Sequence, residues 1–186
     1  MALLLGLCGS VWALEPQRLL EAAREQVGVT RSYDPGYRRL AYPGGDVPLA
    51  TGVCTDVVIR ALRAQGLDLQ VAVHQDMTRH FALYPRNWGL TRPDSNIDHR
   101  RVPNLMTYFS RQGWALKPTQ TAKGYRAGDI LTWDLGGGVL HIGILSDRQS
   151  ADGTPLVLHN IGLGTREDDI LLRYRIIGHY RFPRDA

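Results

Sequence analysis

Hydrophobic residues recur at helical spacing in four segments of the N-terminal two thirds of the chain. Within residues 16–27, apolar positions alternate with charged ones in the manner of an amphipathic helix. A second helix is expected to begin at about Cys54 and to stop at Gly66. Two further helices are expected over residues 71–81 and 103–112. The pattern therefore predicts a helical first part.

After Tyr125 the hydrophobic period shortens to two, with runs rich in β-branched residues. The strands expected from this pattern span residues 129–133, 139–146, 155–161, 170–177 and 179–182. The charged run 166–169 is expected to form a solvated turn. Helices followed by antiparallel strands indicate an α+β fold in which the helices pack on the sheet.

The composition is that of one soluble domain. The chain has 186 residues, of which 44% are hydrophobic and 22% charged, and it shows no internal repeat or linker. The net charge is +4, and among the basic residues only Lys117 and Lys123 are lysine. The arginines are dispersed and no basic helix is interleaved with aromatic residues, which argues against a nucleic-acid partner.

Residues 1–13 differ from everything that follows. They carry no charged side chain, include an apolar run, and end at Val11-Trp12-Ala13 before a polar segment. This pattern is typical of a secretory signal peptide and is too short to span a bilayer. The alternative is an apolar helical turn packed on the core. Export predicts a periplasmic or secreted protein of a single domain over residues 14–186, with no stable membrane span.

Removal of that segment would leave Cys54 as the sole cysteine, because the other one is Cys8. An exported protein with one cysteine does not use it for an internal disulfide, so a catalytic nucleophile is a natural interpretation. Cys54 stands where a loop enters a helix, and the helix N-terminus favours a thiolate and could stabilise an oxyanion. The alternative is a buried cysteine that serves only packing.

Two later segments supply a base and a group to orient it. In the strand around His141, alternate residues face the core, and Gly143 leaves space beside the imidazole. If the following hairpin is symmetric about its polar loop, His141 lies opposite residues 159–160. Nucleophile, base and orienting polar group form the general triad arrangement. The residues alone do not choose between His159 and Asn160, because a slip of one residue exchanges their faces.

These segments resemble the NlpC family of papain-like cell-wall cysteine hydrolases. The likeness covers Cys54 to about Leu62 and Gly128 to about Asn160. Over its whole length the chain also resembles an uncharacterised family of exported bacterial proteins of about two hundred residues. Motifs of that second family stand here at residues 42–48, 52–56, 96–104 and 159–162.

The NlpC resemblance implies a papain-like fold and thiol attack on an amide bond in peptidoglycan stem peptides. It implies Cys54 as nucleophile, His141 as base and His159 as the third member. It also matches Tyr42 to a tyrosine that borders the oxyanion hole, with Tyr33 and Tyr37 as competitors. Residues 67–123 have no counterpart in that family and are expected to shape the substrate cleft.

Several further residues are candidates for substrate or oxyanion binding. Arg100 and Arg101 could grip a substrate carboxylate, or could instead hold a loop through Asp98. Asp56 in the first helical turn and Asn160 complete this set. No cofactor or metal is expected, since the chain lacks HExxH and His-x-His motifs.

The resulting hypothesis is a monomeric thiol amide hydrolase acting on peptidoglycan peptides or a related amide. The alternatives are a non-catalytic cell-wall binding module on a hydrolase-like fold, and a metallohydrolase.

Overall fold

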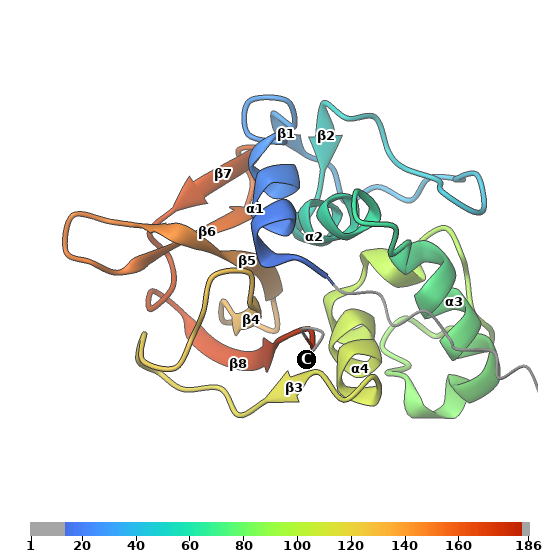
Figure 1. Ribbon diagram of the computed structural model, residues 1–186. Coiled ribbons are helices and arrows are strands. Elements are labelled where there is room, and N and C mark those ends of the chain that lie inside the picture. Colours follow the sequence, from blue (N-terminus) through green and yellow to red (C-terminus); the bar gives the residue numbers. More distant parts are fainter. Residues whose placement is uncertain (1–13, 184–186) are drawn as a thin grey trace, which may run out of the picture.

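The computed structural model describes residues 14–183, so the predicted signal segment lies outside the described residues. Helices form mainly in the first part of the chain and a sheet in the second (Figure 1). The helices are α1 (Pro16–Arg24), α2 (Cys54–Arg63), α3 (Leu69–His80) and α4 (Val102–Arg111), with short 3-10 turns η1 (Phe81–Leu83) and η2 (Asp98–Arg100). All four expected helices are confirmed.

The strands build one large antiparallel sheet and one small parallel pair. They are β1 (Ser32–Tyr33), β2 (Thr51–Gly52), β3 (Ala115–Leu116), β4 (Ile130–Asp134), β5 (Leu140–Gln149), β6 (Pro155–Asn160), β7 (Thr165–Asp168) and β8 (Arg175–Tyr180). The large sheet has the order β3-β8-β4-β5-β6-β7, and β1 pairs with β2. The α+β class predicted from the sequence is thereby confirmed.

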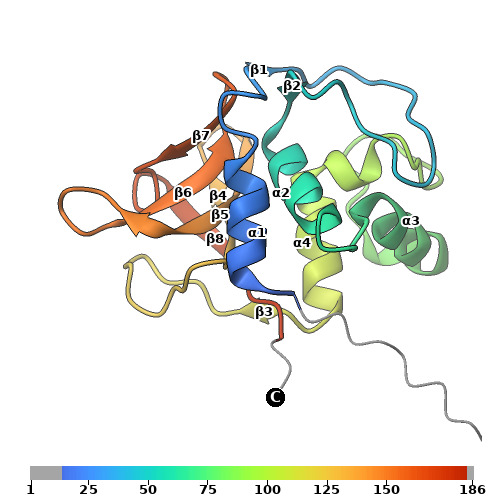
Figure 2. The ribbon, with the colours of Figure 1, turned by 45° about the horizontal axis from the view of Figure 1, so that its top comes forward.

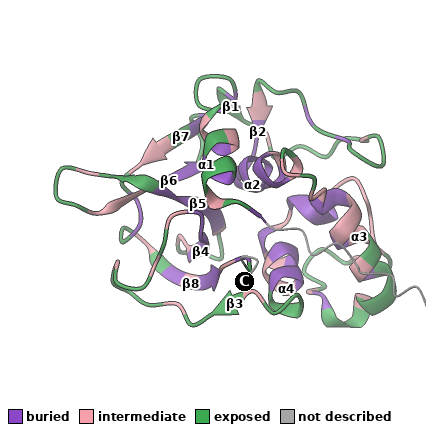
Figure 3. Cartoon of the chain, in the orientation of Figure 1, coloured by how far each residue is buried: buried purple, intermediate pink, exposed green. Residues whose placement is uncertain are grey.

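The main core lies between the helices and one face of this sheet. Figure 2 shows α1 and α2 side by side over the strands, with α4 beyond them. Residues such as Val58 and Leu62 of α2 meet Ile142 and Ile144 of β5 there. A second, smaller cluster around Trp133 covers the opposite face. The central strands are therefore buried on both sides, as the colouring of Figure 3 shows.

Two expectations about the last third of the chain are wrong. The charged run 166–169 is not a turn, because residues 165–168 form the edge strand β7 paired with β6. The expected strand 170–177 does not exist as such: residues 171–173 turn, Ile170 and Leu171 are buried in the second cluster, and β8 begins at Arg175. A hydrophobicity pattern does not predict charged edge strands or buried apolar turns, because burial at such positions depends on tertiary neighbours.

Candidate active site

The thiol of Cys54 lies at the first residue of α2, directly after β2 and Val53. The helix start is held by Asp56, whose carboxylate accepts a hydrogen bond from the Val53 N–H at 2.6 Å. Such a carboxylate in the first turn accepts a hydrogen bond from an otherwise unpaired backbone N–H. Its negative charge is also stabilised by the positive end of the helix dipole. Sequence and backbone together therefore place Cys54 at the helix N-terminus, as expected.

The thiol lies against β5, beyond the residues that pair this strand with β6. These strands pair Ile144 with Leu158, and the pairs of the described ladder do not extend to Ile142. The Ile142 N–H, the Thr55 N–H and the Tyr33 hydroxyl lie next to the Cys54 sulfur, where they favour its charged form. Cys54 thus meets the sheet through the residue next to His141.

The expected low pKa of the thiol is not found. Burial is the largest influence and raises the pKa of Cys54 to about 11, although the donor groups of Ile142, Tyr33 and Thr55 act in the opposite direction. Cys54 is only 3% exposed. The sequence revealed the helix N-terminus but not the burial, and desolvation of the charged form outweighs the dipole.

His141 and His159 form a buried pair. The Nε2 of His141 lies 3.0 Å from the Nδ1 of His159, and the two rings meet edge to face. The contact is diagonal, because the strand register places Gly143 beside His159. The symmetric hairpin that was expected is displaced by an irregularity between Leu145 and Gln149. A diagonal contact of this kind is within reach of long side chains.

Both imidazoles are held in the neutral form. Burial lowers the pKa of His141 to about 3, and the neighbouring His159 adds to this. Burial also lowers the pKa of His159 to about 4, although Asp168 on β7 opposes the shift. The Nε2 of His159 lies 3.5 Å from the Asp168 carboxylate. The sequence pattern does not identify Asp168, because it predicts a turn where β7 forms.

Asn160 faces away from His141. Its side-chain amide donates hydrogen bonds to the carbonyl oxygens of Gly52 at 3.1 Å and Ser32 at 3.4 Å. It thereby ties the small β1–β2 pair to β6. The structure thus brings His159, and not Asn160, to His141, while Asn160 supports the segment that precedes Cys54.

Tyr33 is the tyrosine beside the thiol. It lies on β1 opposite Gly52 of β2, so the parallel pair sets its position relative to Cys54. Tyr42 does not line the cavity next to Cys54; it is exposed and stacks edge-on against His74, with ring centroids 5.3 Å apart. Tyr42, which the family resemblance matches to the tyrosine at the oxyanion hole, therefore lies away from the thiol.

Asp56 and Arg100 are joined to each other. The guanidinium of Arg100 donates two hydrogen bonds of 2.9 Å to the Asp56 carboxylate, and both side chains are almost fully buried. Arg100 also reaches the carbonyl oxygens of Asp34 and Gly36. These two residues thus link α2 to η2 and to the loop after Tyr33.

A cavity of about 590 Å³ opens beside Cys54. Tyr33, Val53 and Leu140 line one part of it, whereas Trp88, Arg101 and Pro103 come from the segment 67–123. This volume lies in the range of small-molecule sites. The segment that was expected to shape the cleft therefore contributes part of its lining.

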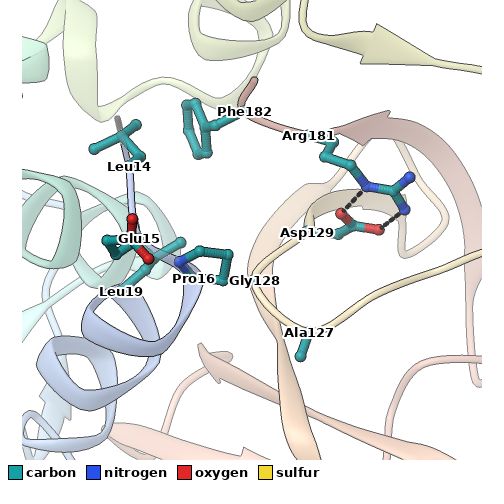
Figure 4. A pocket seen from close by; sticks show the side chains of 9 residues that line it. All are labelled: Leu14, Glu15, Pro16, Leu19, Ala127, Gly128, Asp129, Arg181 and Phe182. Atoms are coloured by element: carbon teal, nitrogen blue, oxygen red, sulfur yellow. Dashed lines mark hydrogen bonds and ion pairs between the residues drawn. The ribbon is translucent and has the colours of Figure 1, made fainter. Parts of the chain in front are cut away.

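A second, much smaller cavity lies near the start of α1 (Figure 4). Its volume is about 20 Å³, which suits a single water. Arg181 closes one side through two 2.7 Å hydrogen bonds to Asp129, and His179 contacts the same carboxylate. These groups satisfy one another, so this cavity is structural.

Within residues 14–183, no group of three or more His, Cys, Asp or Glu side chains is arranged to hold a metal ion. Over the same part of the chain, no helix has the length and apolarity to cross a membrane.

Fold and site together define an α+β protein with a buried thiol at the wall of a sizeable cavity, next to the strand β5 that carries His141. The chain belongs to the DUF1287 family, described as a domain of unknown function, whose model matches residues 20–182. It is 56% identical over 164 residues to a protein of Escherichia coli (strain K12) named Uncharacterized protein YijF, covering 88% of this chain and 80% of YijF.

Among solved structures, the chain is similar to a Staphylococcus aureus protein described as similar to lipoprotein, NLP/P60 family. The TM-score is 0.43 at 10% sequence identity, over 95% of this chain. The chain spans 45% of the length of that protein.

Proposed function

We propose that this protein is a thiol-dependent amide hydrolase with Cys54 as nucleophile, His141 as base and His159 as the orienting residue. The observation that carries the proposal is the position of the Cys54 thiol, which lies at the wall of a cavity and next to Ile142 of β5. The same strand carries His141, which contacts His159 of β6. The motif resemblance to NlpC-type hydrolases supports the same assignment.

The proposed reaction begins from neutral side chains. The Cys54 sulfur attacks the amide carbon while its proton passes to the Nδ1 of His141, the nitrogen not occupied by His159. Within residues 14–183 no hydrogen bond joins this thiol and imidazole, and such contacts commonly tighten only when substrate is bound. The Cys54 N–H and the Tyr33 hydroxyl would receive the developing oxyanion.

The remaining steps conserve this proton. His141 returns it to the leaving amine as the C–N bond breaks, which leaves an acyl group on the sulfur. Water then attacks the acyl carbon and gives a proton to His141, and the S–C bond breaks as that proton returns to the thiol. The products are a carboxylic acid and an amine. With an amine in place of water, the same steps form a new amide.

The proposed substrate is an amide of a peptidoglycan stem peptide, and the proposed location is the bacterial cell envelope. The substrate rests on the NlpC-type resemblance, and the location on the charge-free apolar segment 1–13. Amino-terminal sequencing of the protein from a periplasmic fraction tests the location. A retained residue 1 in that fraction would contradict cleavage after Ala13.

Mass spectrometry of purified muropeptides after incubation with the protein tests the function. Cleavage should add one water per broken amide and should vanish in Cys54→Ala. The matched control is His80→Ala, which removes an exposed histidine on α3 and should retain full turnover. Binding of muropeptides without any mass change would instead indicate a non-catalytic cell-wall module.

A further inference from the structure

The cavity beside Cys54 carries a positive charge and no negative one among its lining residues. Arg100 and Arg101 both line it, and no aspartate or glutamate does. Arg100 is neutralised by Asp56, which pairs with it through two hydrogen bonds. Arg101 has only a longer ion pair, to Asp98 at 3.7 Å, so the charge that the cavity offers to a ligand is mainly that of Arg101.

Arg101 is held in place but is poorly supplied with hydrogen-bond acceptors. Its guanidinium carbon lies 4.0 Å from the centre of the Trp88 ring, a stacking contact that fixes the plane of the group. Its Nη1 is buried without a hydrogen-bond partner, and the nearest oxygen of Asp98 is 3.7 Å away. Asp98 thus supports the guanidinium from one side at a distance too long for a hydrogen bond.

A guanidinium in this position is costly to the protein alone. The side chain is only 16% exposed, and burial lowers the pKa of Arg101. Removing a charge from water without acceptors for its donors is unfavourable. Arg100, the neighbouring residue, shows the contrast, because its donors reach a carboxylate and two carbonyl oxygens. A carboxylate ligand would give Arg101 hydrogen-bond acceptors of the kind that Arg100 already has.

We infer that Arg101, stacked on Trp88, is a subsite for a free carboxylate of the substrate, distinct from the amide that reacts at Cys54. This inference rests on the proposed function for the choice of substrate, which is then an acidic peptide. Arginine suits this task because its planar fork pairs with both carboxylate oxygens.

The surroundings leave room for an extended ligand. A second hollow of about 720 Å³ shares Tyr37 with the first, and Arg39 and Arg92 line it. Its one lining carboxylate, Asp94, accepts hydrogen bonds from Tyr37 and Asn96. An acidic peptide could run from Cys54 past Arg101 and across Tyr37, where Arg39 and Arg92 outnumber the negative charge of Asp94.

Calorimetric binding to the full chain carrying Cys54→Ala tests the subsite without requiring turnover. The probes are muropeptides with free carboxylates and the same muropeptides with those groups converted to carboxamides. Conversion should weaken binding by about ten- to a hundred-fold, as expected for the loss of a hydrogen-bonded ion pair. In Cys54→Ala with Arg101→Gln the two forms should bind equally well. The matched control, Arg18→Gln on the exposed side of α1, should keep the preference.

Equal binding of the two forms by the Cys54→Ala protein would overturn the inference, and so would the absence of any binding. This comparison needs no change at Arg101, so it holds even if Arg101→Gln fails to fold. Arg101→Lys offers a second variant that keeps the charge but loses two-point pairing, and it should retain less than half of the preference in free energy. Preferential binding without cleavage by the wild-type protein would refute the proposed hydrolase while supporting the subsite. Cleavage by the wild-type protein together with equal binding of the two forms would support the hydrolase and refute the subsite.

Discussion

The Nε2 of His141 lies 3.0 Å from the Nδ1 of His159, so the two rings share one hydrogen at this contact and their tautomers are linked. If the Nδ1 of His141 is to accept a proton from Cys54, its Nε2 must carry the hydrogen and donate it to His159. The hydrogen of neutral His159 then sits on Nε2, which faces Asp168 at 3.5 Å. This arrangement of hydrogens satisfies the contact between the two rings and leaves the Nε2 hydrogen of His159 facing Asp168 without a hydrogen bond.

The reactivity of Cys54 should follow a high pKa. With the pKa of the buried thiol raised to about 11, the thiolate fraction near neutral pH is on the order of 10⁻⁴. Alkylation by iodoacetamide should be slow there and should accelerate with pH up to about 11. Peptide mapping by mass spectrometry gives the rate at Cys54 itself, with Cys54→Ser as the background. A rate that levels off below about pH 8 would show a thiolate instead.

Replacement of Cys54 should separate chemistry from folding. Cys54→Ala removes one buried sulfur from the core and should lower the free energy of unfolding by only about 1 kcal/mol. It should abolish muropeptide cleavage completely. Turnover of the wild-type protein should be unchanged by EDTA. Activity that EDTA removes and zinc restores would identify a metallohydrolase.

His159→Ala should slow turnover less than loss of Cys54 or His141. The orienting group holds His141 in the useful tautomer, and its loss should cost about ten- to a thousand-fold in kcat. KM should change little, because His159 is fully buried and does not line the cavity. His159→Gln retains an acceptor for His141 and should recover part of the rate. Equal rates for His159→Ala and the wild type would refute the assignment.

Asn160→Ala should act on stability first. Its amide donates to the Gly52 and Ser32 carbonyl oxygens, so removal takes one donor from each, and the Gly52 oxygen keeps only the Asp34 N–H. The expected loss is about 1–3 kcal/mol in the free energy of unfolding, measured by urea denaturation. The β1–β2 pair also positions Tyr33, so turnover should fall modestly too. An unchanged urea midpoint would contradict this role.

Gly143→Ala should disturb the histidine pair without touching either ring. An added Cβ would lie 2.7 Å from the Val157 side chain, 3.0 Å from the Leu158 carbonyl oxygen and 3.1 Å from the His159 Cβ. Relief of these contacts must shift β6, at a cost of about 1–3 kcal/mol. The melting temperature and turnover should both fall. An unchanged melting temperature and unchanged turnover would show that β5 and β6 can move apart at Gly143 without cost.

Acid should destabilise the fold through the buried histidines. The folded-state pKa is lowered from 6.5 to about 3 for His141 and to about 4 for His159. The unfolded chain therefore binds protons first as pH falls. The contribution of these histidines to the free energy of unfolding is fully present above pH 6.5. It is lost progressively as the pH falls toward the folded-state pKa values. Urea midpoints measured from about pH 7 to about pH 4 should decline, and less steeply in His159→Gln.

The order of helices and strands was accessible from the sequence, because local hydrophobic periodicity reports which face of an element is buried. The same is true of Cys54 at a helix start and of His141 on a strand. The contact of His159 with His141 was predicted only with the help of the family resemblance. Local pattern alone left His159 and Asn160 equivalent, since they are adjacent on one strand and face opposite ways.

Only the tertiary structure decided how these residues act on one another. Burial of Cys54 reversed the expected direction of its pKa, and desolvation depends on neighbours far away in the chain. Tyr33 rather than Tyr42 lies at the thiol because β1 pairs with β2, a contact between segments 19 residues apart in register. Arg100 and Arg101 are identical and adjacent in sequence, yet Asp56 neutralises one while the other stacks on Trp88 at the cavity. Sequence supplied the reactive groups, and long-range packing determined their charge, their partners and their access to a ligand.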